Sequence, residues 1–335
     1  LRGQSSIAGR LGPFPSCYRL FCLGDERGCS LLLFVFAPLL FLGEFAVRVR
    51  QSVALAADGS TRLRRRIATP RGDYAATLAA VAGIVAGVEH ELGQCGTVGV
   101  GIPGAESLVS GLIKNANSTC LIGKPLRRDL QALLQREVRI ANDANCFALS
   151  EAIDGSGRDA GIVFGVILGT GVGGGVVVDR HVLTGANAIA GEWGHNPLPL
   201  PTTDDLPLPD CYCGRQGCIE TYLSGPGLAA DHDRRNGQQR TAPEIVRAAE
   251  NGDVHCEASL RRYESRLGRA LAGVINLLDP EVIVLGGGMS QVQRLYRNLP
   301  DCCAPHVFSD RVLTRFLPPR HGDSSGVRGA AWLWN

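Results

Sequence analysis

The stretch Ala141 to Ala152 reads ANDANCFALSEA, and it places an Asn-Asp pair between two kinds of secondary structure. The preceding REVRI, residues 136–140, is typical of a short strand, and CFALSEA has helical character. Asn142 and Asp143 are therefore expected at a strand-to-helix turn, where a site can form. An Asp there can also act only as a helix cap, because its side-chain oxygen satisfies free N–H groups of the first turn.

Length and composition indicate a globular chain with two lobes. The chain has 335 residues, which is more than one ordinary compact domain contains. Of these residues, 45% are hydrophobic and 20% are charged, as in a globular protein. The 43 glycines are clustered, which suggests loops that touch ligands. The net charge is only +2, and no long basic stripe with interleaved aromatics occurs, so we do not expect nucleic acid as a partner.

Two features bear on the compartment. Three of the twelve cysteines are packed between residues 211 and 218, and the others are scattered, which favours a reduced, cytoplasmic protein with one metal site. The apolar run Leu31 to Leu42 is broken by Pro38 and is too short for a membrane span of about 20 residues.

Residues 1 to about 50 differ from the rest, and we interpret them as foreign to the domain rather than as a buried segment.

From Val53 the pattern becomes regular. Residues 53–70 predict two strands joined by an Asp-Gly turn, and Tyr74 to Leu92 has helical spacing. GTVGVGIPG, residues 96–104, predicts a buried strand with a turn at Gly101 to Gly104, and Leu126 to Leu134 predicts an amphipathic helix. This order is typical of an α/β lobe with a mixed sheet.

The segment Gly161 to Leu183 carries a glycine pattern that formally matches G-x-G-x-x-G. A dinucleotide fold requires a helix after these glycines, but VVVD follows, so we predict a glycine-rich hairpin. Its tip can either be a structural bend or present several N–H groups to phosphate oxygens. The residues concerned are Gly169, Thr170, Gly171, Gly173 and Gly174.

A metal-ligand set follows this hairpin. His195, Cys211, Cys213 and Cys218 supply one imidazole and three thiolates, which predicts a closed, structural zinc site. Such a site would bring Glu192 near Glu220. Two carboxylates and the Asn-Asp pair in one cleft suit a polyhydroxylated ligand, because each hydroxyl offers a donor and an acceptor.

The last third continues the α/β pattern. Helices are predicted over Ala242 to Glu250 and Leu260 to Leu278, and a short helix is predicted at the C-terminus. EVIVLGGGMS, Glu281 to Ser290, predicts a buried strand that ends in Gly286, Gly287 and Gly288, where a flat base could lie against bare backbone. Trp332 and Trp334 are interpreted as core or interface residues.

From about Val53 to Trp334 the chain resembles the sugar kinases of the ROK family (repressor, open reading frame, kinase), and it is most similar to the fructokinase or mannofructokinase branch. The motifs are GVGIPG, NANST, ANDANC, LGTGVGGG, GEWGHNPLP, CYCGRQGCIE, VIVLGGGMS and HGDSSGVRGAAWLW. The resemblance implies two actin-like (ribonuclease H-like) α/β lobes around a cleft, with a zinc-binding loop, and a homodimer.

The resemblance also implies roles for individual residues. Asp143 would be the general base toward the primary hydroxyl of a sugar, while ATP with Mg²⁺ supplies the phosphoryl group. Asn142, Glu192, His195 and Glu220 would hold sugar hydroxyls, with His195 also a ligand of structural Zn²⁺. Gly169 to Gly174 would cradle phosphates, and Gly286 to Gly288 would line the adenosine site.

The chain departs from the family before Val53. Family members carry an Asp-x-Gly-Gly-Thr-Lys phosphate loop there, whereas this chain reads GEFAVRVRQS. We interpret residues 1–50 as unmatched sequence that replaces the first strand and this loop, through a frameshift or a wrongly chosen start. Residues 51–141 would form the N-terminal lobe and 142–335 the C-terminal lobe, with the last helix returning to the N-terminal lobe.

Three functional hypotheses follow. The leading one is ATP-dependent phosphorylation of D-fructose to fructose 6-phosphate. The second is a kinase for another hexose, namely N-acetylglucosamine, glucose or mannose. The third is a catalytically impaired sugar-binding protein of the same family, because the phosphate loop is absent. A repressor is disfavoured, since residues 1–50 contain Pro13, Pro15 and Pro38 and lack the helix pair of a helix-turn-helix.

Overall fold

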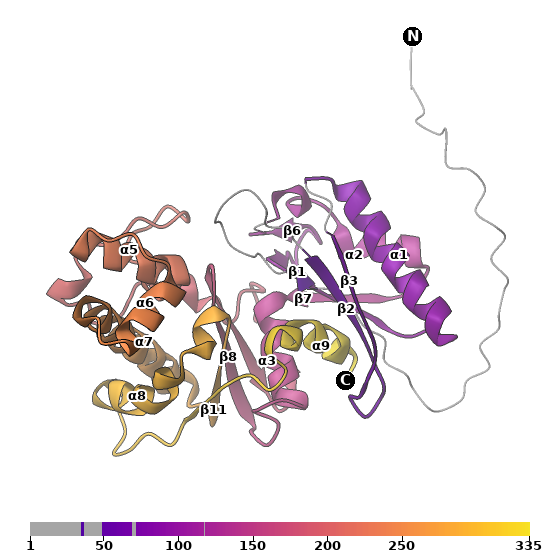
Figure 1. Cartoon of the computed structure of the whole chain (residues 1–335). Helices are drawn as coiled ribbons and strands as arrows, with labels where there is room; N and C mark the ends of the chain where they lie inside the picture. The colour runs from indigo at the N-terminus through magenta and orange to yellow at the C-terminus, as the bar shows by residue number, and fades with distance from the viewer. Residues whose placement is uncertain (1–34, 37–48, 69–71, 117) are drawn as a thin grey trace, which may run out of the picture.

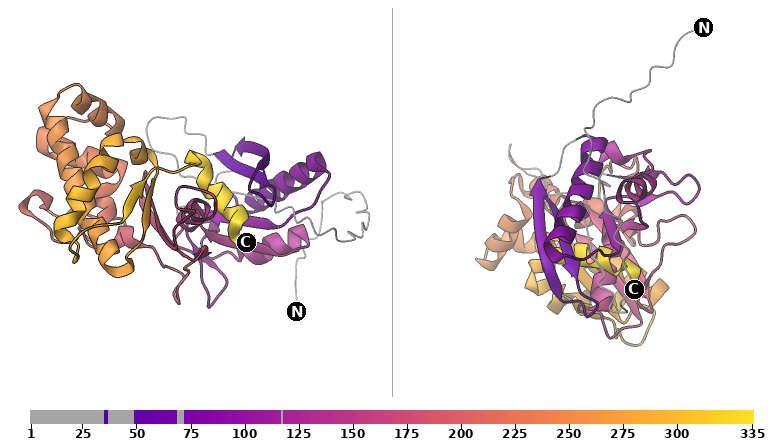
Figure 2. Two further views of the ribbon diagram at one scale, coloured as in Figure 1. Left: turned by 90° about the horizontal axis from the view of Figure 1, so that it is seen from below. Right: turned by 90° about the vertical axis from the view of Figure 1, so that its right-hand side faces the viewer.

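The chain forms two α/β lobes that lie side by side (Figures 1 and 2). The structure is a computed structural model, and it describes residues 35–36, 49–68, 72–116 and 118–335. The helix α3 (Asp143–Ile153) lies between the lobes, so the predicted Asn-Asp turn is placed at their junction.

The N-terminal lobe is built from short strands and two helices. In order, its elements are β1 (Val35–Phe36), β2 (Val49–Leu55), β3 (Thr61–Ala68), α1 (Tyr74–Leu92), β4 (Val98–Ile102), β5 (Ala105–Glu106), β6 (Ile113–Lys114), the 3-10 turn η1 (Thr119–Leu121), α2 (Leu126–Leu134) and β7 (Val138–Asn142). The predicted helices over 74–92 and 126–134 therefore have the bounds expected from their apolar spacing.

The predicted hairpin is confirmed as β2 and β3, which pair antiparallel. Its turn contains Asp58, whose carboxylate accepts a hydrogen bond from the Ser60 N–H at 2.8 Å. Gly59 follows with φ +80°, a left-handed conformation that glycine adopts without steric cost. Local turn chemistry thus sets this hairpin.

Helix α1 is capped at both ends. Asp73 accepts from the Ala76 N–H at its start, and Gly93 ends it with a left-handed φ of 64°. Among the described helices, α1 is the one that could cross a membrane by length and apolar composition alone. Its side chains Val81, Val85 and Val88 pack in the core of the N-terminal lobe.

The strands of the N-terminal lobe form separate sheets within the described residues. β1, β2 and β3 make one sheet, and β4 pairs in parallel with β7 in another. The two-residue β1 pairs with β2 at Arg50 and Gln51 and also contacts β4, so it stands between the two sheets. The absence of the family's first strand would leave the lobe with two sheets in place of one. That this strand is absent remains a prediction.

The C-terminal lobe has a five-stranded mixed sheet in the order β10-β9-β8-β11-β12. Its strands and helices after α3 are β8 (Ile162–Leu168), β9 (Val172–Val178), β10 (His181–Val182), η2 (Trp193–His195), η3 (Thr203–Asp205), α4 (Ile219–Leu223), α5 (Gly225–Asn236), α6 (Ala242–Glu250), α7 (Val254–Leu278), β11 (Val282–Gly286), η4 (Gly288–Gln291), α8 (Gln293–Cys303), η5 (Ala304–His306), β12 (Arg315–Leu317), η6 (Gly322–Ser324), α9 (Ser325–Ala331) and η7 (Trp332–Trp334).

Both faces of this sheet are buried. Side chains alternate along a strand, so Ile283 and Leu285 of β11 join the core beneath helices α4 to α8, while Val282 and Val284 join the core around α3. This explains why VIVLG reads as a continuous apolar run, as a strand covered on two sides does. The glycine-rich segment is a β8-β9 hairpin without a following helix, as predicted.

One predicted boundary is wrong. Helix α7 begins at Val254, six residues before the predicted Leu260, because Asp253 caps it by accepting hydrogen bonds from the N–H groups of His255 and Cys256. This cap precedes the apolar stripe from which the helix was predicted. The helix ends at Leu278, just before Pro280, as expected.

The C-terminal helix α9 connects the lobes. It packs on α3, and its side chains Val327 and Ala331 lie in the core of the N-terminal lobe. Trp332 contacts the cores on both sides, and the Arg139 guanidinium lies over the Trp334 ring at 4.1 Å. The interpretation of the two tryptophans as core or interface residues agrees with these contacts.

Candidate active site

The Asn-Asp turn joins β7 to α3, and the structure separates the roles of its two residues. Asn142 is the N-cap: its amide oxygen accepts hydrogen bonds from the N–H groups of Ala144 (2.8 Å) and Asn145 (3.4 Å). Its amide nitrogen donates to the Gly104 carbonyl at 3.2 Å, which ties the glycine-proline turn to the head of α3. Capping therefore does not depend on Asp143.

Asp143 is held with one carboxylate oxygen toward the helix. That oxygen accepts from the Ala144 N–H at 2.9 Å, and the other has no hydrogen-bond partner within the described part of the chain. Burial raises the pKa of Asp143 to about 7, and the negative charge of Glu192 adds to this rise. A carboxylate with a pKa near neutrality is suited to accept a proton from a hydroxyl.

The two predicted carboxylates, Glu192 and Glu220, are brought close together. Burial raises the pKa of Glu192, and the charge of Glu220 contributes in the same direction, while His195 and Lys114 oppose it. Asp143, Glu192 and Glu220 therefore interact electrostatically within one region, although they come from three separate segments. A ligand rich in hydroxyl groups could satisfy such a set of acceptors.

Glu220 also supports the glycine-rich hairpin. Its Oε2 atom accepts a hydrogen bond from the Val172 N–H at 2.8 Å. A Cβ atom on Gly171 would lie 2.6 Å from the same oxygen, so a side chain at this position would displace the carboxylate. Glu220 thus links the tip of the hairpin to α4, a contact that sequence reasoning did not predict.

Several of the predicted nucleotide-binding glycines pack against the protein itself. A Cβ on Gly174 would lie 2.7 Å from the Gly191 carbonyl oxygen, and one on Gly286 would lie 2.6 Å from the Phe147 ring. Gly287 has φ +77° and closely approaches the Leu168 carbonyl. These glycines are therefore required by internal packing, whatever else they do.

Gly169 and Gly288 differ from these glycines. A Cβ on Gly288 would meet nothing within 4 Å, and one on Gly169 would meet only the Ile167 side chain, at 3.9 Å. The backbone carbonyl of Gly169 accepts from the Gly225 N–H at 2.8 Å, which fixes the position of the turn. Gly169 and Gly288 are thus the predicted glycines with open space beside their α-carbons.

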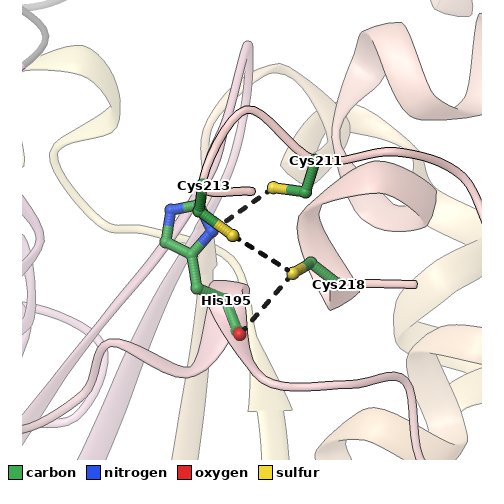
Figure 3. Close-up of side chains that lie close together, drawn as sticks. All are labelled: His195, Cys211, Cys213 and Cys218. Atoms are coloured by element: carbon green, nitrogen blue, oxygen red, sulfur yellow. Dashed lines mark hydrogen bonds between the residues drawn. The ribbon is translucent and has the colours of Figure 1, made fainter. Parts of the chain in front are cut away.

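The predicted metal ligands converge. Ligand atoms of His195, Cys211, Cys213 and Cys218 all lie within 4.8 Å of one another (Figure 3). His195 Nδ1 is 3.6 Å from Cys211 Sγ, and the sulfurs of Cys213 and Cys218 are also 3.6 Å apart. Sulfurs on a tetrahedral zinc are about 3.8 Å apart, given Zn–S bonds of about 2.3 Å, so the donor set fits this ion.

Three residues at or near this site were missed by the sequence analysis. Tyr212 forms a hydrogen bond with His195, and Lys114 donates one to the Asn187 carbonyl in the other lobe. Asp205, in the segment before the cysteines, accepts a hydrogen bond from Arg266. Tyr212 had one available signal, since it is the central residue of Cys-x-Cys. The contacts of the other two depend on segments distant in sequence.

A sequence profile described as the ROK family matches residues 50–335. The chain belongs to the ROK family. The N-acetyl-D-glucosamine kinase of Erwinia tasmaniensis is 44% identical over 274 residues, covering 81% of this chain and 90% of that protein. The enzyme of the same name from Citrobacter koseri is 43% identical over 282 residues, covering 82% and 93%.

Solved structures of this family share the fold. The ROK hexokinase of Thermus thermophilus is 27% identical with a TM-score of 0.76, and the alignment covers 85% of this chain and 93% of that one. A ROK glucokinase from Streptomyces griseus, in complex with glucose and AMPPNP, is 25% identical with a TM-score of 0.69 and covers 85% and 95%. The predicted actin-like two-lobed fold is therefore confirmed.

These matches define the activity at the level of the class and correct one preference. The chain is a sugar kinase, as the resemblance implied, and the profile match confirms that about the first 50 residues lie outside the family domain. The two sequence relatives, from Erwinia tasmaniensis and Citrobacter koseri, are N-acetyl-D-glucosamine kinases and not fructokinases. The second hypothesis, another hexose, is thus better supported than fructose.

Proposed function

We propose that this ROK protein transfers the γ-phosphoryl group of ATP to the primary hydroxyl of N-acetyl-D-glucosamine. The observation that carries the proposal is the 42–44% identity to N-acetyl-D-glucosamine kinases over most of the chain. The cluster of Asp143, Glu192 and Glu220 supports it, because these acceptors can fix the hydroxyl groups of a sugar.

Asp143 would be the general base. Its free carboxylate oxygen would hold the attacking hydroxyl and take its proton as the oxygen–phosphorus bond forms. Phosphoryl transfer depends mainly on positioning and on neutralising charge, so orientation of the hydroxyl is the larger part of this role. Glu192 and Glu220 would hold other hydroxyls directly, one hydroxyl would lie on the Nε2 side of His195, and Asn142 would support the turn.

The nucleotide would lie along the glycine segments. Gly169 to Gly174, including Thr170, would face the phosphates, and Gly286 to Gly288 would face the adenosine. Gly169 and Gly288 are the best placed of these, since the space beside their α-carbons is open. Mg²⁺ bound with ATP would neutralise the phosphate charge during transfer.

We also propose that His195, Cys211, Cys213 and Cys218 hold one structural zinc ion. The four donors leave no open coordination position, so the ion would fix the loop rather than take part in chemistry. Metal analysis of the purified chain should find about one zinc per chain, and chelation should lower the thermal midpoint of unfolding. A folded protein without zinc would contradict the assignment.

The proposal is tested by ADP release with Mg-ATP and N-acetylglucosamine, run beside glucose, mannose and fructose. We expect kcat/KM to be highest for N-acetylglucosamine. Asp143→Asn should lower kcat by at least about 100-fold and leave the dissociation constant of the sugar within about tenfold. Near-normal turnover by this variant would rule out Asp143 as the base.

A second candidate is a sugar-binding protein without turnover. The observation that favours it is the sequence GEFAVRVRQS, which stands where the family carries Asp-x-Gly-Gly-Thr-Lys. Calorimetry of sugar binding, combined with the ADP-release assay, separates the two candidates. Sugar binding without ADP release supports the second. Restoring the family sequence at this place should then restore turnover.

We further infer lobe boundaries at residues 51–141 and 142–335 and a homodimer, as the resemblance implies, and a cytoplasmic location, as the cysteine pattern suggests. Light scattering on the purified chain tests the dimer directly. Fractionation of the source cells tests the location.

A further inference from the structure

The side chain of Tyr212 has an unusual position for an exposed residue. It stands between two of the clustered cysteines, and 75% of its surface is exposed. Its hydroxyl nevertheless lies 2.9 Å from His195 Nε2, and its ring contacts the imidazole edge-on with 5.1 Å between ring centres. An exposed aromatic ring is thus held in place by one hydrogen bond and one ring contact.

The two nitrogens of His195 face different partners. Nδ1 faces Cys211 Sγ at 3.6 Å, and Nε2 faces the Tyr212 hydroxyl. A metal on the cysteine side would occupy Nδ1 and leave the proton on Nε2, which would then donate to the Tyr212 oxygen. The Tyr212 O–H group would then be free to donate to a further acceptor.

The hydroxyl of Tyr212 is placed at the candidate active site by its contact with His195, and both glutamates of that site act on it electrostatically. Burial is the largest cause that raises the pKa of Tyr212, and the negative charges of Glu220, Cys211, Glu192 and Cys213 add to it. A phenol has an ordinary pKa of about 10, and its hydroxyl can both donate and accept at neutral pH. Tyr212 therefore has the chemistry that recognition of a sugar hydroxyl requires.

We propose that Tyr212 is a substrate-positioning residue whose hydroxyl binds a hydroxyl group of the hexose beside His195. The inference rests on the proposed function only where it names the sugar as N-acetylglucosamine. That Tyr212 binds some sugar does not depend on that choice. It assigns Tyr212 to affinity for the sugar and not to the phosphoryl transfer step.

The test compares Tyr212→Phe with the unchanged chain. Phenylalanine keeps the ring contact with His195 and removes only the hydroxyl. We expect KM for N-acetylglucosamine and its calorimetric dissociation constant without ATP to rise about three- to tenfold, the size of one neutral hydrogen bond. KM for ATP, zinc content and kcat should stay within about twofold.

Tyr74→Phe is the matched control. The Tyr74 hydroxyl donates to Asp129 at 2.8 Å, in the N-terminal lobe, so the same chemical change there should leave sugar affinity unaltered. If Tyr212→Phe binds and turns over the sugar as the unchanged chain does, the role of Tyr212 is refuted and the proposed function stands.

Binding separates the remaining outcomes. If the unchanged chain binds N-acetylglucosamine without turnover and Tyr212→Phe binds it more weakly, the role of Tyr212 is supported and the proposed function is refuted. If the chain binds none of N-acetylglucosamine, glucose, mannose or fructose, both are refuted. An equal rise in KM for ATP would also refute the role, since it would show a general effect on the candidate site.

Discussion

Asp143 acquires its chemistry from groups that are distant in sequence. Burial at the head of α3 raises the pKa of its carboxyl to about 7, and the charge of Glu192 adds to the rise. The cap of α3 is provided by Asn142, whose amide oxygen accepts from two N–H groups of the first turn. Burial and a nearby like charge together raise the pKa of Asp143 to near neutral pH.

This environment predicts the pH dependence of the reaction. Because Asp143 must be ionised to accept a proton, kcat/KM should rise with pH up to about 7, with a slope of about tenfold per pH unit below it. Glu192→Gln removes a negative charge that raises the pKa of Asp143, so the rising limb should shift to lower pH. A flat profile between about pH 5.5 and 8 would contradict the base assignment.

At the scale of elements, a buried ion network fixes the segment that precedes the cysteines. Asp205 accepts from Arg266 Nε at 2.8 Å and from Arg269 Nη1 at 2.9 Å, and Asp205 is 1% exposed. Burial disfavours its charge, but hydrogen bonds from Arg269, the Thr202 N–H and Arg266 outweigh this and keep the pKa of Asp205 below its usual range. The network joins η3 to α7.

The same network extends to α4, which carries Glu220. The Tyr222 hydroxyl donates to the Asp205 carbonyl at 2.8 Å, and the Arg266 guanidinium lies over the Tyr222 ring at 4.9 Å. The position of Glu220 therefore depends on charged groups outside the candidate site. Sequence patterns did not indicate this network, because the amino-acid sequence alone does not distinguish a buried Arg from an exposed one.

Asp205→Asn should destabilise the protein by about 3 kcal/mol, because it leaves two buried guanidinium groups with less negative charge. Urea unfolding measures this change. The control is Asp159→Asn, whose carboxylate is 80% exposed and pairs with the half-exposed Arg158 at 3.5 Å, so its effect should stay within about 0.5 kcal/mol. Equal stability of the two variants would show that the network contributes little.

At the scale of the whole molecule, Lys114 connects the two lobes near the candidate sugar site. Its ammonium donates to the Asn187 carbonyl at 2.8 Å, from β6 in one lobe to the loop after β10 in the other. The charge of Lys114 also opposes the rise in the pKa of Glu192, so it lies near the carboxylates. The contact would favour the arrangement of lobes in which Lys114 lies near these carboxylates.

Lys114→Met should raise KM for the sugar about three- to tenfold and change the thermal midpoint of unfolding little, since the contact is exposed. Lys124→Met is the control, because Lys124 is the only other lysine in the sequence and lies over the Tyr74 ring in the N-terminal lobe. If both variants have the same KM as the unchanged chain, the contact with Asn187 does not affect sugar binding.

Features of this chain that depend on residues near one another in sequence could be predicted before the fold was known. The hairpin around Asp58 and Gly59, the bounds of α1 and the strand-to-helix turn at Asn142 follow from turn chemistry, caps and apolar spacing. Cys-x-Cys with a nearby third Cys likewise indicated the cluster with His195, since few arrangements other than a metal site use these residues together.

Which groups face one another became clear from the three-dimensional fold. In the fold, Glu220 contacts the glycine hairpin and Tyr212 contacts His195. Gly174 is closely packed against neighbouring atoms, whereas the space beside the α-carbon of Gly288 is open. Contacts of this kind join segments tens of residues apart, and their energies depend on distance and burial, which no local pattern contains. For this reason the sequence predicted the parts of the site, and the fold determined their contacts.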